Sequence, residues 1–376
     1  MKNFKSLFCV LLFCCCALVY ADDKAEIKKC VEGALRAGCN MDWETVKKFA
    51  SADYVKITEN NKVLDRKLLE NMAIYWKSVK APDLTFSELV KLNAMLQGKT
   101  LTDEQMANYR KLDSTEHGKS LVKKTKEQLE NTENNIRQIA AEVMKKVQYG
   151  PMYVKDDLAV WFYKSDYVVK LKGVLVLRKE NGSWKLYREF SSLDSEKNTD
   201  VANVEEVRKF AEDGYKKSSD FSSYTELLAD ISRGYIAVMP NANGQVVNYE
   251  KSEKMAKFYD IIESENPTMV KAGPLYMEAF GIKLTPEILA KFADQDKNGQ
   301  GEKFIQQYKN ELAKHRKALK NISDNKVKDI FVFEDCALLI DSLVLPITGK
   351  IERISLLKKN QGKYFYYRSV SRKSDK

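Results

Sequence analysis

Residues 98–109, GKTLTDEQMANY, and residues 281–292, GIKLTPEILAKF, are two copies of one sequence. In each copy a glycine stands four positions before a threonine, as when a helix-ending residue is followed by the N-cap of the next helix. Gln105 completes a capping box with Thr102, and the proline after Thr285 suits the first position of a helix, where its missing N–H costs nothing. We therefore expect a helix to begin at the same place in each copy.

The similarity extends well beyond these two stretches. Aligned without a gap at an offset of 183 positions, residues 67–129 and 250–312 share 14 identical residues in 63. Unrelated sequences of this length would share about 4. Both halves also repeat one order of expected elements, namely helices, a short strand pair, a further helix, a helical segment and a set of closing strands. The chain is therefore an internal duplication, and its 376 residues are enough for two domains.

The order of expected elements gives the domain boundaries. Residues 1–21 have the pattern of a signal peptide, residues 22–192 form the first expected domain, and residues 203–376 form the second. A polar stretch separates the two domains. Each domain is expected to contain a helical insert, at about 85–140 and about 268–320, because these segments are too apolar and too periodic to be linkers.

The N-terminus has the features of an export signal. Lys2 and Lys5 precede an apolar run, and Val19 and Ala21 are the small residues at alternate positions that signal peptidase needs, so we expect cleavage after Ala21. The run is shorter than the roughly 20 residues of a membrane-spanning helix. Cys14 suggests a lipid anchor, but bulky residues precede it where a lipidation motif has small ones. We expect an exported protein, either periplasmic or secreted.

The composition disfavours two further classes of protein. Outside the signal peptide only Cys30, Cys39 and Cys336 remain, too few for a disulfide framework. A bond between Cys30 and Cys39 and two unpaired thiols stay open as alternatives. The net charge is +10, but basic and acidic residues alternate along the chain and form no track for phosphates. Nucleic acid is therefore not an expected partner.

The closing strands carry a resemblance to a known family. Residues 175–186, LVLRKENGSWKL, predict a β-hairpin around an Asn-Gly turn, and each half ends in an antiparallel meander. In this order of elements the chain resembles the nuclear transport factor 2-like (SnoaL-like) superfamily, in which a curved sheet wraps around helices and leaves an apolar pocket. The resemblance implies an α+β fold with two tandem cone-like domains, each with N-terminal helices and a curved antiparallel sheet. The helical insert in each half departs from that pattern.

Candidate ligand residues lie on the closing strands and on the helix expected to cover them. Strand alternation predicts that Arg188 and Arg368 face inward, and Glu70 and Glu253 are matched between the halves on the covering helix. A structural Glu–Arg pair in each half is one interpretation, because a buried guanidinium needs a partner. The other is an arginine presented to an anionic ligand. The aromatic residues expected either to line pockets or to fill cores include Tyr54, Trp76, Tyr235 and Tyr259.

No catalytic or metal-binding motif is complete. Residues 294–299, DQDKNG, open like a calcium loop, but Ile305 stands where a bidentate carboxylate belongs, so a helix-ending polar turn is the alternative. The only histidines, His117 and His315, fall in the polar inserts. The sequence contains no nucleophile triad, cysteine–histidine cluster or glycine-rich phosphate loop. We therefore expect no metal, no cofactor and no catalytic residue.

These observations favour an exported, non-catalytic protein that binds a small apolar or anionic ligand, or a protein partner through its inserted helices. The alternative is a lyase or isomerase that acts on a small apolar substrate in a cone pocket, with a tyrosine and a carboxylate as acid and base. The superfamily holds both kinds of protein, so its fold alone does not decide between them. The inner face of each sheet does, because an enzyme needs an open pocket that contains a carboxylate.

Overall fold

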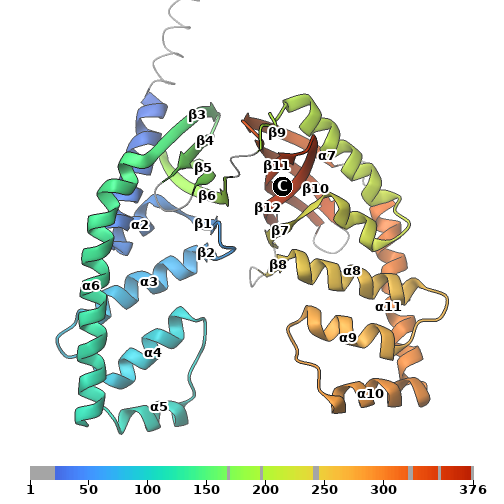
Figure 1. Ribbon diagram of the computed structural model, residues 1–376, viewed down its shortest axis with the longest axis horizontal. Coiled ribbons are helices and arrows are strands. Elements are labelled where there is room, and N and C mark those ends of the chain that lie inside the picture. Colours follow the sequence, from blue (N-terminus) through green and yellow to red (C-terminus); the bar gives the residue numbers. More distant parts are fainter. Residues whose placement is uncertain are drawn as a thin grey trace, which may run out of the picture. The chain divides into compact units, whose positions relative to one another are not determined.

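The computed structural model describes residues 22–166, 170–194, 198–239, 245–320, 325–345 and 349–373. The chain divides into two compact units between Asp194 and Ser195. Each unit combines helices with one six-stranded sheet, so the predicted α+β class is confirmed (Figure 1). The expected signal peptide lies outside the described residues. Across the ranges above, no helix combines the length and the apolar character needed to cross a bilayer.

The two units contain the same series of elements. The first unit consists of a helix over residues 22–39, α2 (Trp43–Phe49), β1 (Ala50–Ile57), β2 (Val63–Asp65), α3 (Arg66–Val79), α4 (Phe86–Leu96), α5 (Asp103–Arg110), α6 (Glu116–Lys146), β3 (Val147–Lys155), β4 (Leu158–Ser165), β5 (Leu171–Glu180) and β6 (Ser183–Leu193). The second unit consists of α7 (Val204–Ser219), a 3-10 helix η1 (Tyr224–Asp230), β7 (Ile231–Val238), β8 (Val246–Asn248), α8 (Tyr249–Glu263), α9 (Met269–Ala279), α10 (Pro286–Lys297), α11 (Gln300–Lys320), β9 (Lys326–Phe333), β10 (Cys336–Leu345), β11 (Gly349–Asn360) and β12 (Lys363–Lys373).

The sheets have one topology. The strand orders are β2-β1-β6-β5-β4-β3 and β8-β7-β12-β11-β10-β9. The first long strand of each unit pairs in parallel with the last, and every other described pairing is antiparallel. The expected closing meander is therefore present in both units, and its last strand connects it to the N-terminal strand pair.

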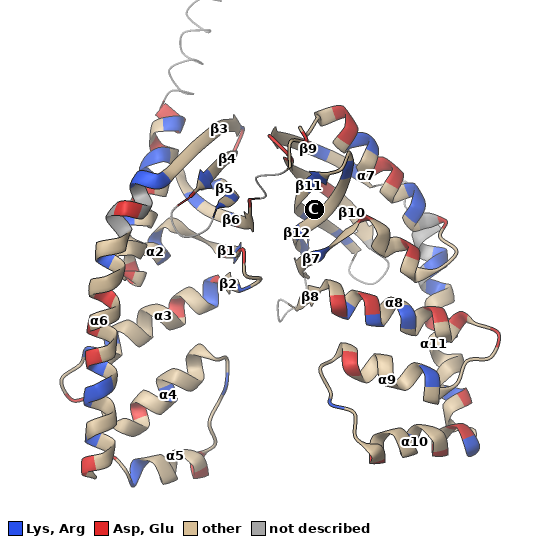
Figure 2. Cartoon of the chain, viewed as in Figure 1, with Lys and Arg blue, Asp and Glu red and all other residues tan. Residues whose placement is uncertain are grey.

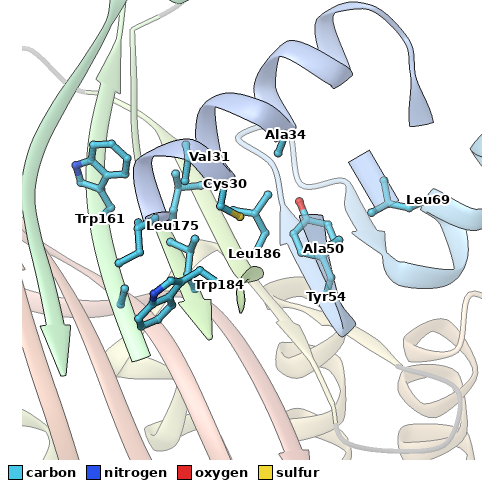
Figure 3. Packing of buried hydrophobic residues seen from close by; sticks show 13 residues of the cluster. Cys30, Val31, Ala34, Ala50, Tyr54, Leu69, Trp161, Leu175, Trp184 and Leu186 are labelled. Atoms are coloured by element: carbon cyan, nitrogen blue, oxygen red, sulfur yellow. The ribbon is translucent and has the colours of Figure 1, made fainter. Parts of the chain in front are cut away.

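One face of each sheet, here called the inner face, is covered by the first helix of its unit. In the first unit Cys30, Val31 and Ala34 of that helix pack against Leu175 and Leu186 of the sheet (Figure 3). In the second unit α7 takes the same role, with Val207 and Ala211 in one buried cluster with Leu339 and Leu357. The inner face of each sheet is therefore occupied by side chains of the protein itself.

Each helical insert consists of two short helices and one long helix, α6 or α11, and packs beside the preceding helix, α3 or α8 (Figure 1). The predicted helix starts are confirmed. The side chain of Thr102 accepts a bond from the backbone N–H of Gln105 in a complete capping box, and Thr285 caps α10. The preceding glycines, Gly98 and Gly281, have φ of +67° and +72°, which L side chains rarely adopt.

Besides the threonine caps, both inserts contain a carboxylate that caps the start of a helix. Asp113 accepts bonds from the backbone N–H and the hydroxyl of Ser87, at 2.7 and 2.8 Å, near the start of α4. Asp296 accepts bonds from the backbone N–H groups of Met269 and Val270, at 2.8 and 3.0 Å, at the start of α9. These contacts fix the end of the second short helix of each insert against the start of the first. Asp296 belongs to the segment 294–299 that resembles a calcium loop, so one carboxylate of that segment serves as a helix cap. The last turn of α10 runs through the same segment.

We expect Asp113→Ala and Asp296→Ala each to lower the free energy of unfolding by about 1 to 2 kcal/mol, because each removes a charged acceptor from a helix N-terminus. Urea unfolding of each variant measures this. Asp296→Asn, which keeps one acceptor oxygen, is the matched control and should lose less. A change below about 0.5 kcal/mol, typical of an ordinary surface substitution, would show that the cap contributes little.

Candidate functional site

The inner face of the first sheet carries a polar cluster centred on Glu189 of β6. Lys56 lies directly opposite on β1, and its ammonium is 2.7 Å from Glu189 Oε1. The hydroxyl of Tyr54 donates to Oε2 at 3.2 Å, and that of Tyr163 donates to Oε1 at 3.4 Å. Three strands therefore bring two phenols and an ammonium to one carboxylate.

The cluster is largely withdrawn from solvent. Tyr54 is 5% exposed, and the Glu189 side chain is 12% exposed. Burial, and then the negative charge of Glu189, raise the pKa of both Tyr54 and Tyr163 well above the usual value for a phenol. Both phenols therefore stay protonated at neutral pH and act as donors to Glu189. The Glu189 carboxylate therefore has its hydrogen-bond donors and its counter-charge from side chains of its own unit.

The second sheet has an ionic cluster in the corresponding region. Arg353 of β11 contacts Asp341 of β10 through Nε at 3.1 Å and Nη2 at 2.5 Å. The hydroxyl of Tyr215 donates to Asp341 at 2.8 Å, and Arg353 donates to the Tyr366 hydroxyl at 3.1 Å. Asp341 is fully buried. The two inner faces therefore carry different polar groups on one scaffold.

The pKa values of this second cluster follow from its burial. Burial raises the pKa of Tyr366 to about 12, with Arg353 opposing the shift and Asp341 adding to it. Burial and then Asp341 raise the pKa of Tyr215 further. Burial alone would lower the pKa of Arg353, but the Asp341 carboxylate outweighs it and holds that pKa well above its ordinary value. The cluster is therefore an ion pair between Arg353 and Asp341 to which two neutral phenols, those of Tyr215 and Tyr366, are hydrogen-bonded.

The predicted inward orientation of Arg188 and Arg368 is wrong, because each closing strand contains a β-bulge. The register of β6 against β5 shifts by one residue at Tyr187, and that of β12 against β11 shifts at Tyr367. One extra residue exchanges the two faces of a strand. Glu189 therefore takes the inner position that alternation assigns to Arg188.

The arginines tie neighbouring strands together. Arg188 donates through Nη1 to the Asp53 carbonyl of β1, and its Nη2 lies 3.5 Å from the Asp53 carboxylate. Arg368 donates in the same way to the Gly234 carbonyl of β7. Each guanidinium also stacks on the tyrosine before it, 3.7 and 4.0 Å from the ring centroids. These contacts link the last strand of each unit to its first.

The predicted pairs between glutamate and arginine are also wrong. Glu70 is exposed on α3 and accepts a bond from Arg66 at 3.0 Å, one helical turn earlier. Glu253 lies on α8 and pairs with Lys257 at 3.1 Å. Both glutamates occupy the helix surface and bond within their own helix, whereas the arginines are buried on the sheets.

The four aromatic candidates divide between the sheets and the inserts. Tyr54 belongs to the core cluster of the first cone. Tyr235 is its counterpart on β7, where burial raises its pKa and the nearby Arg353 opposes the rise. Trp76 and Tyr259 instead pack against core clusters that include the inserted helices, which agrees with the core-filling alternative.

A hollow of about 900 Å³ lies beside the first insert, the segment through which a protein partner is expected to bind, but none of its lining residues was among the predicted site residues. Its wall consists of α3, α4, α5 and the loops beside them. One of the lining residues, Ile74 of α3, is apolar and 47% exposed, which only the packed structure shows.

Comparison with known proteins finds matches among solved structures alone. No protein-family model matches the chain, and no curated protein matches its sequence. Solved structures do match, each over about half of the chain. They are NTF2-like proteins. An NTF2-like protein of unknown function from Silicibacter pomeroyi is 9% identical, with TM-score 0.24, and the match covers 46% of this chain and 98% of its own.

Two further matches illustrate the range of the fold. An NTF2-like protein with a cystatin-like fold from Novosphingobium aromaticivorans is 10% identical with TM-score 0.25, and the match covers 48% of this chain and 88% of its own. A ketosteroid isomerase-like protein from Erwinia carotovora atroseptica is 13% identical with TM-score 0.21, and the match covers 46% of this chain and 95% of its own. Each of these matches covers about half of this chain. At these identities and TM-scores the likeness carries no argument about activity.

Proposed function

We propose that this protein is a non-catalytic binding protein that contacts its partner through the inserted helices. The occupied inner face of the first sheet carries the proposal. The first helix fills that face, and Glu189 is bonded by Tyr54, Tyr163 and Lys56. A substrate would have to displace this packing, whereas the hollow on the first insert is open to a partner.

Cross-linking in the native source tests where the partner binds. A photoreactive benzoylphenylalanine replaces Ile74 in the hollow, Lys62 in the turn between β1 and β2, or Lys56 beside Glu189. We expect a discrete adduct from position 74 and none from position 62, which is exposed but lies on another element. An adduct from position 56 without one from position 74 would place the partner at the cone and contradict the proposal.

The second candidate function is a lyase or isomerase, favoured by the two phenols that meet one carboxylate at Glu189. A carboxylate beside a phenol is able to move a proton between carbon atoms of a substrate. The ketosteroid isomerase-like relative supplies a substrate class to assay. We expect no isomerisation above the buffer rate from the wild-type protein or from Glu189→Gln. A rate that Glu189→Gln abolishes would establish the enzyme instead.

We also propose that the chain is exported and is either periplasmic or secreted, on the strength of the apolar run that follows Lys2 and Lys5. We expect the protein isolated from its source to begin at Asp22, as N-terminal sequencing would show. Replacement of the small residue before the cleavage site, Ala21→Leu, should leave the precursor uncut. A wild-type protein that retains Met1, or one that carries lipid at a cysteine, would contradict this expectation.

A further inference from the structure

We infer that the hollow on the first insert is a docking groove for an amphipathic helix of a protein partner, and that acidic residues flank the apolar stripe of that helix. The inference rests on the proposed function and adds the chemistry of the partner. Three features of the described residues support it: the helical faces that form the groove, the charges at its rim, and the ion pair that replaces two groove residues in the second unit.

The groove is built from one face of each short helix. The residues of α3 that line it are Lys67, Asn71, Ile74 and Ser78, spaced by four, three and four positions. On α4 the lining residues are spaced by three, one, two and one positions, from Glu88 to Met95, and α5 contributes Asp103, Met106 and Arg110. Residues at such spacing lie along one side of a helix. A trough between parallel helical faces is the shape that receives another helix.

The floor of the groove is apolar. Leu92 and Met95 of α4 are partly buried against the core of the insert and still line the hollow. Ile74 of α3 is 47% exposed above them, and Met106 of α5 faces them across the trough. Methionine and branched aliphatic side chains adapt to an apolar partner surface. The apolar stripe of a docked helix would cover these side chains.

The rim of the groove carries four basic side chains. They are Lys67, Lys91, Lys99 and Arg110, and none of the four makes an ion pair with any residue that the structure describes. Figure 2 shows basic residues at the β2 end of α3 and in the loop between α4 and α5.

The acidic side chains of the rim are Asp83, Glu88 and Asp103, one fewer than the basic ones. Glu88 accepts a bond from the backbone N–H of Thr85 in the α4 capping box. The rim therefore has a small excess of positive charge, which favours acidic groups on a partner.

The second unit carries charged side chains on the same surface. At the positions of Asn71 and Met95 it has Lys254 and Glu278, and the Lys254 ammonium lies 3.5 Å from Glu278. This ion pair links α8 to α9. The same ammonium is 2.8 Å from Glu250, the counterpart of Lys67. Three charged side chains therefore stand where the first unit has a lysine, an asparagine and a methionine.

The distribution of charge favours a helix over a small amphiphile. A fatty acid or similar ligand needs cations that converge on one headgroup. Lys67 and Lys99 stand at one end of the trough, Lys91 in its middle and Arg110 toward the other end, as the order of the antiparallel helices requires. Separated cations of this kind match acidic residues spread along a helical segment.

Selection of displayed random 16-residue peptides on the full chain tests the inference. We expect the enriched peptides to combine apolar residues at i, i+3 or i+4, and i+7 with several Asp or Glu, and to lose affinity as salt is raised. The double variant Asn71→Lys/Met95→Glu, which copies the second unit, should weaken binding by at least about tenfold. The reciprocal variant Lys254→Asn/Glu278→Met is the matched control and should leave affinity unchanged.

Other outcomes overturn the inference. Peptides that lack acidic residues, or that bind the Asn71→Lys/Met95→Glu protein equally well, would show that the groove is not their site. Oleate that binds the wild type but not this variant, with no peptide enriched, would identify a lipid ligand instead. An unchanged thermal midpoint for the variant excludes misfolding. Cross-links from position 74 that persist without any enriched peptide would reject the acidic helix and leave the proposed function standing.

Discussion

Asp341→Ala is expected to destabilise the second unit by about 3 to 5 kcal/mol, because it leaves the buried guanidinium of Arg353 without its counter-charge. Asp341 is fully buried and makes two contacts with Arg353, at 2.5 and 3.1 Å. The substitution also removes the acceptor of the Tyr215 hydroxyl. Hydrogen exchange of peptides from β10 and β11 measures the loss, and peptides from the first unit serve as an internal reference.

The double variant Asp341→Ala/Arg353→Met separates the ion pair from the cavity left by the missing side chain. It removes both charges, so its loss should be smaller than that of Asp341→Ala alone. An equal or larger loss in the double variant, or a loss below about 1 kcal/mol in the single one, would show that solvent reaches Arg353 and replaces its partner.

Phe258→Ala is expected to cost about 3 to 5 kcal/mol, the usual range for truncating a buried aromatic residue. Phe258 is fully buried at the centre of the second insert. Its ring lies 5.2 Å from that of Tyr308 of α11 and 5.3 Å from that of Tyr276 of α9, so it joins three helices. Such aromatic contacts add to the energy of burial. Exchange of peptides from α8, α9 and α11 measures the effect.

The neighbouring residue of the same helix gives the control for this prediction. Lys257 is exposed on α8, and Lys257→Ala should change the free energy of unfolding by less than about 0.5 kcal/mol. All four tryptophans, Trp43, Trp76, Trp161 and Trp184, are in the first unit, so their fluorescence reports that unit separately. A loss for Phe258→Ala no larger than for Lys257→Ala would mean that the insert collapses to fill the space.

Sequence reasoning succeeded where the signal is local. The caps at Thr102 and Thr285 and the helix-ending glycines depend on residues within one turn, and all are present in the structure. The duplication and the closing hairpins follow from the same kind of local pattern. The α+β class was predictable because the order of elements was predictable.

Reasoning failed where one residue changes the outcome of a whole strand. The bulges at Tyr187 and Tyr367 carry no local marker, and each reverses the face of every residue after it. Arg188 was therefore assigned to the inner face, and Glu189, which occupies it, was missed. Two tyrosines and a lysine on partner strands were available to indicate Glu189, but only strand pairing brings them together.

The hollow on the first insert was unpredictable for a different reason. It lies between three helices, and the sequence pattern of one helix does not show how far that helix stands from its neighbours. Trp76 shows the related difficulty with helix faces: α3 packs against both the sheet and the insert, so an aromatic residue on it has two apolar destinations. Only the packed structure decides which one it takes.

The recurrence of the carboxylate cap at Asp113 and Asp296 bears on the history of the gene. The same residue type at the same alignment position holds the start of the first short helix in both inserts. Independent acquisition of the inserts after fusion would require this tertiary contact to arise twice. The simpler descent is from a single-unit ancestor that already possessed its insert, copied whole in one tandem event. The ion pair between Lys254 and Glu278 then records divergence of the two copies after that event.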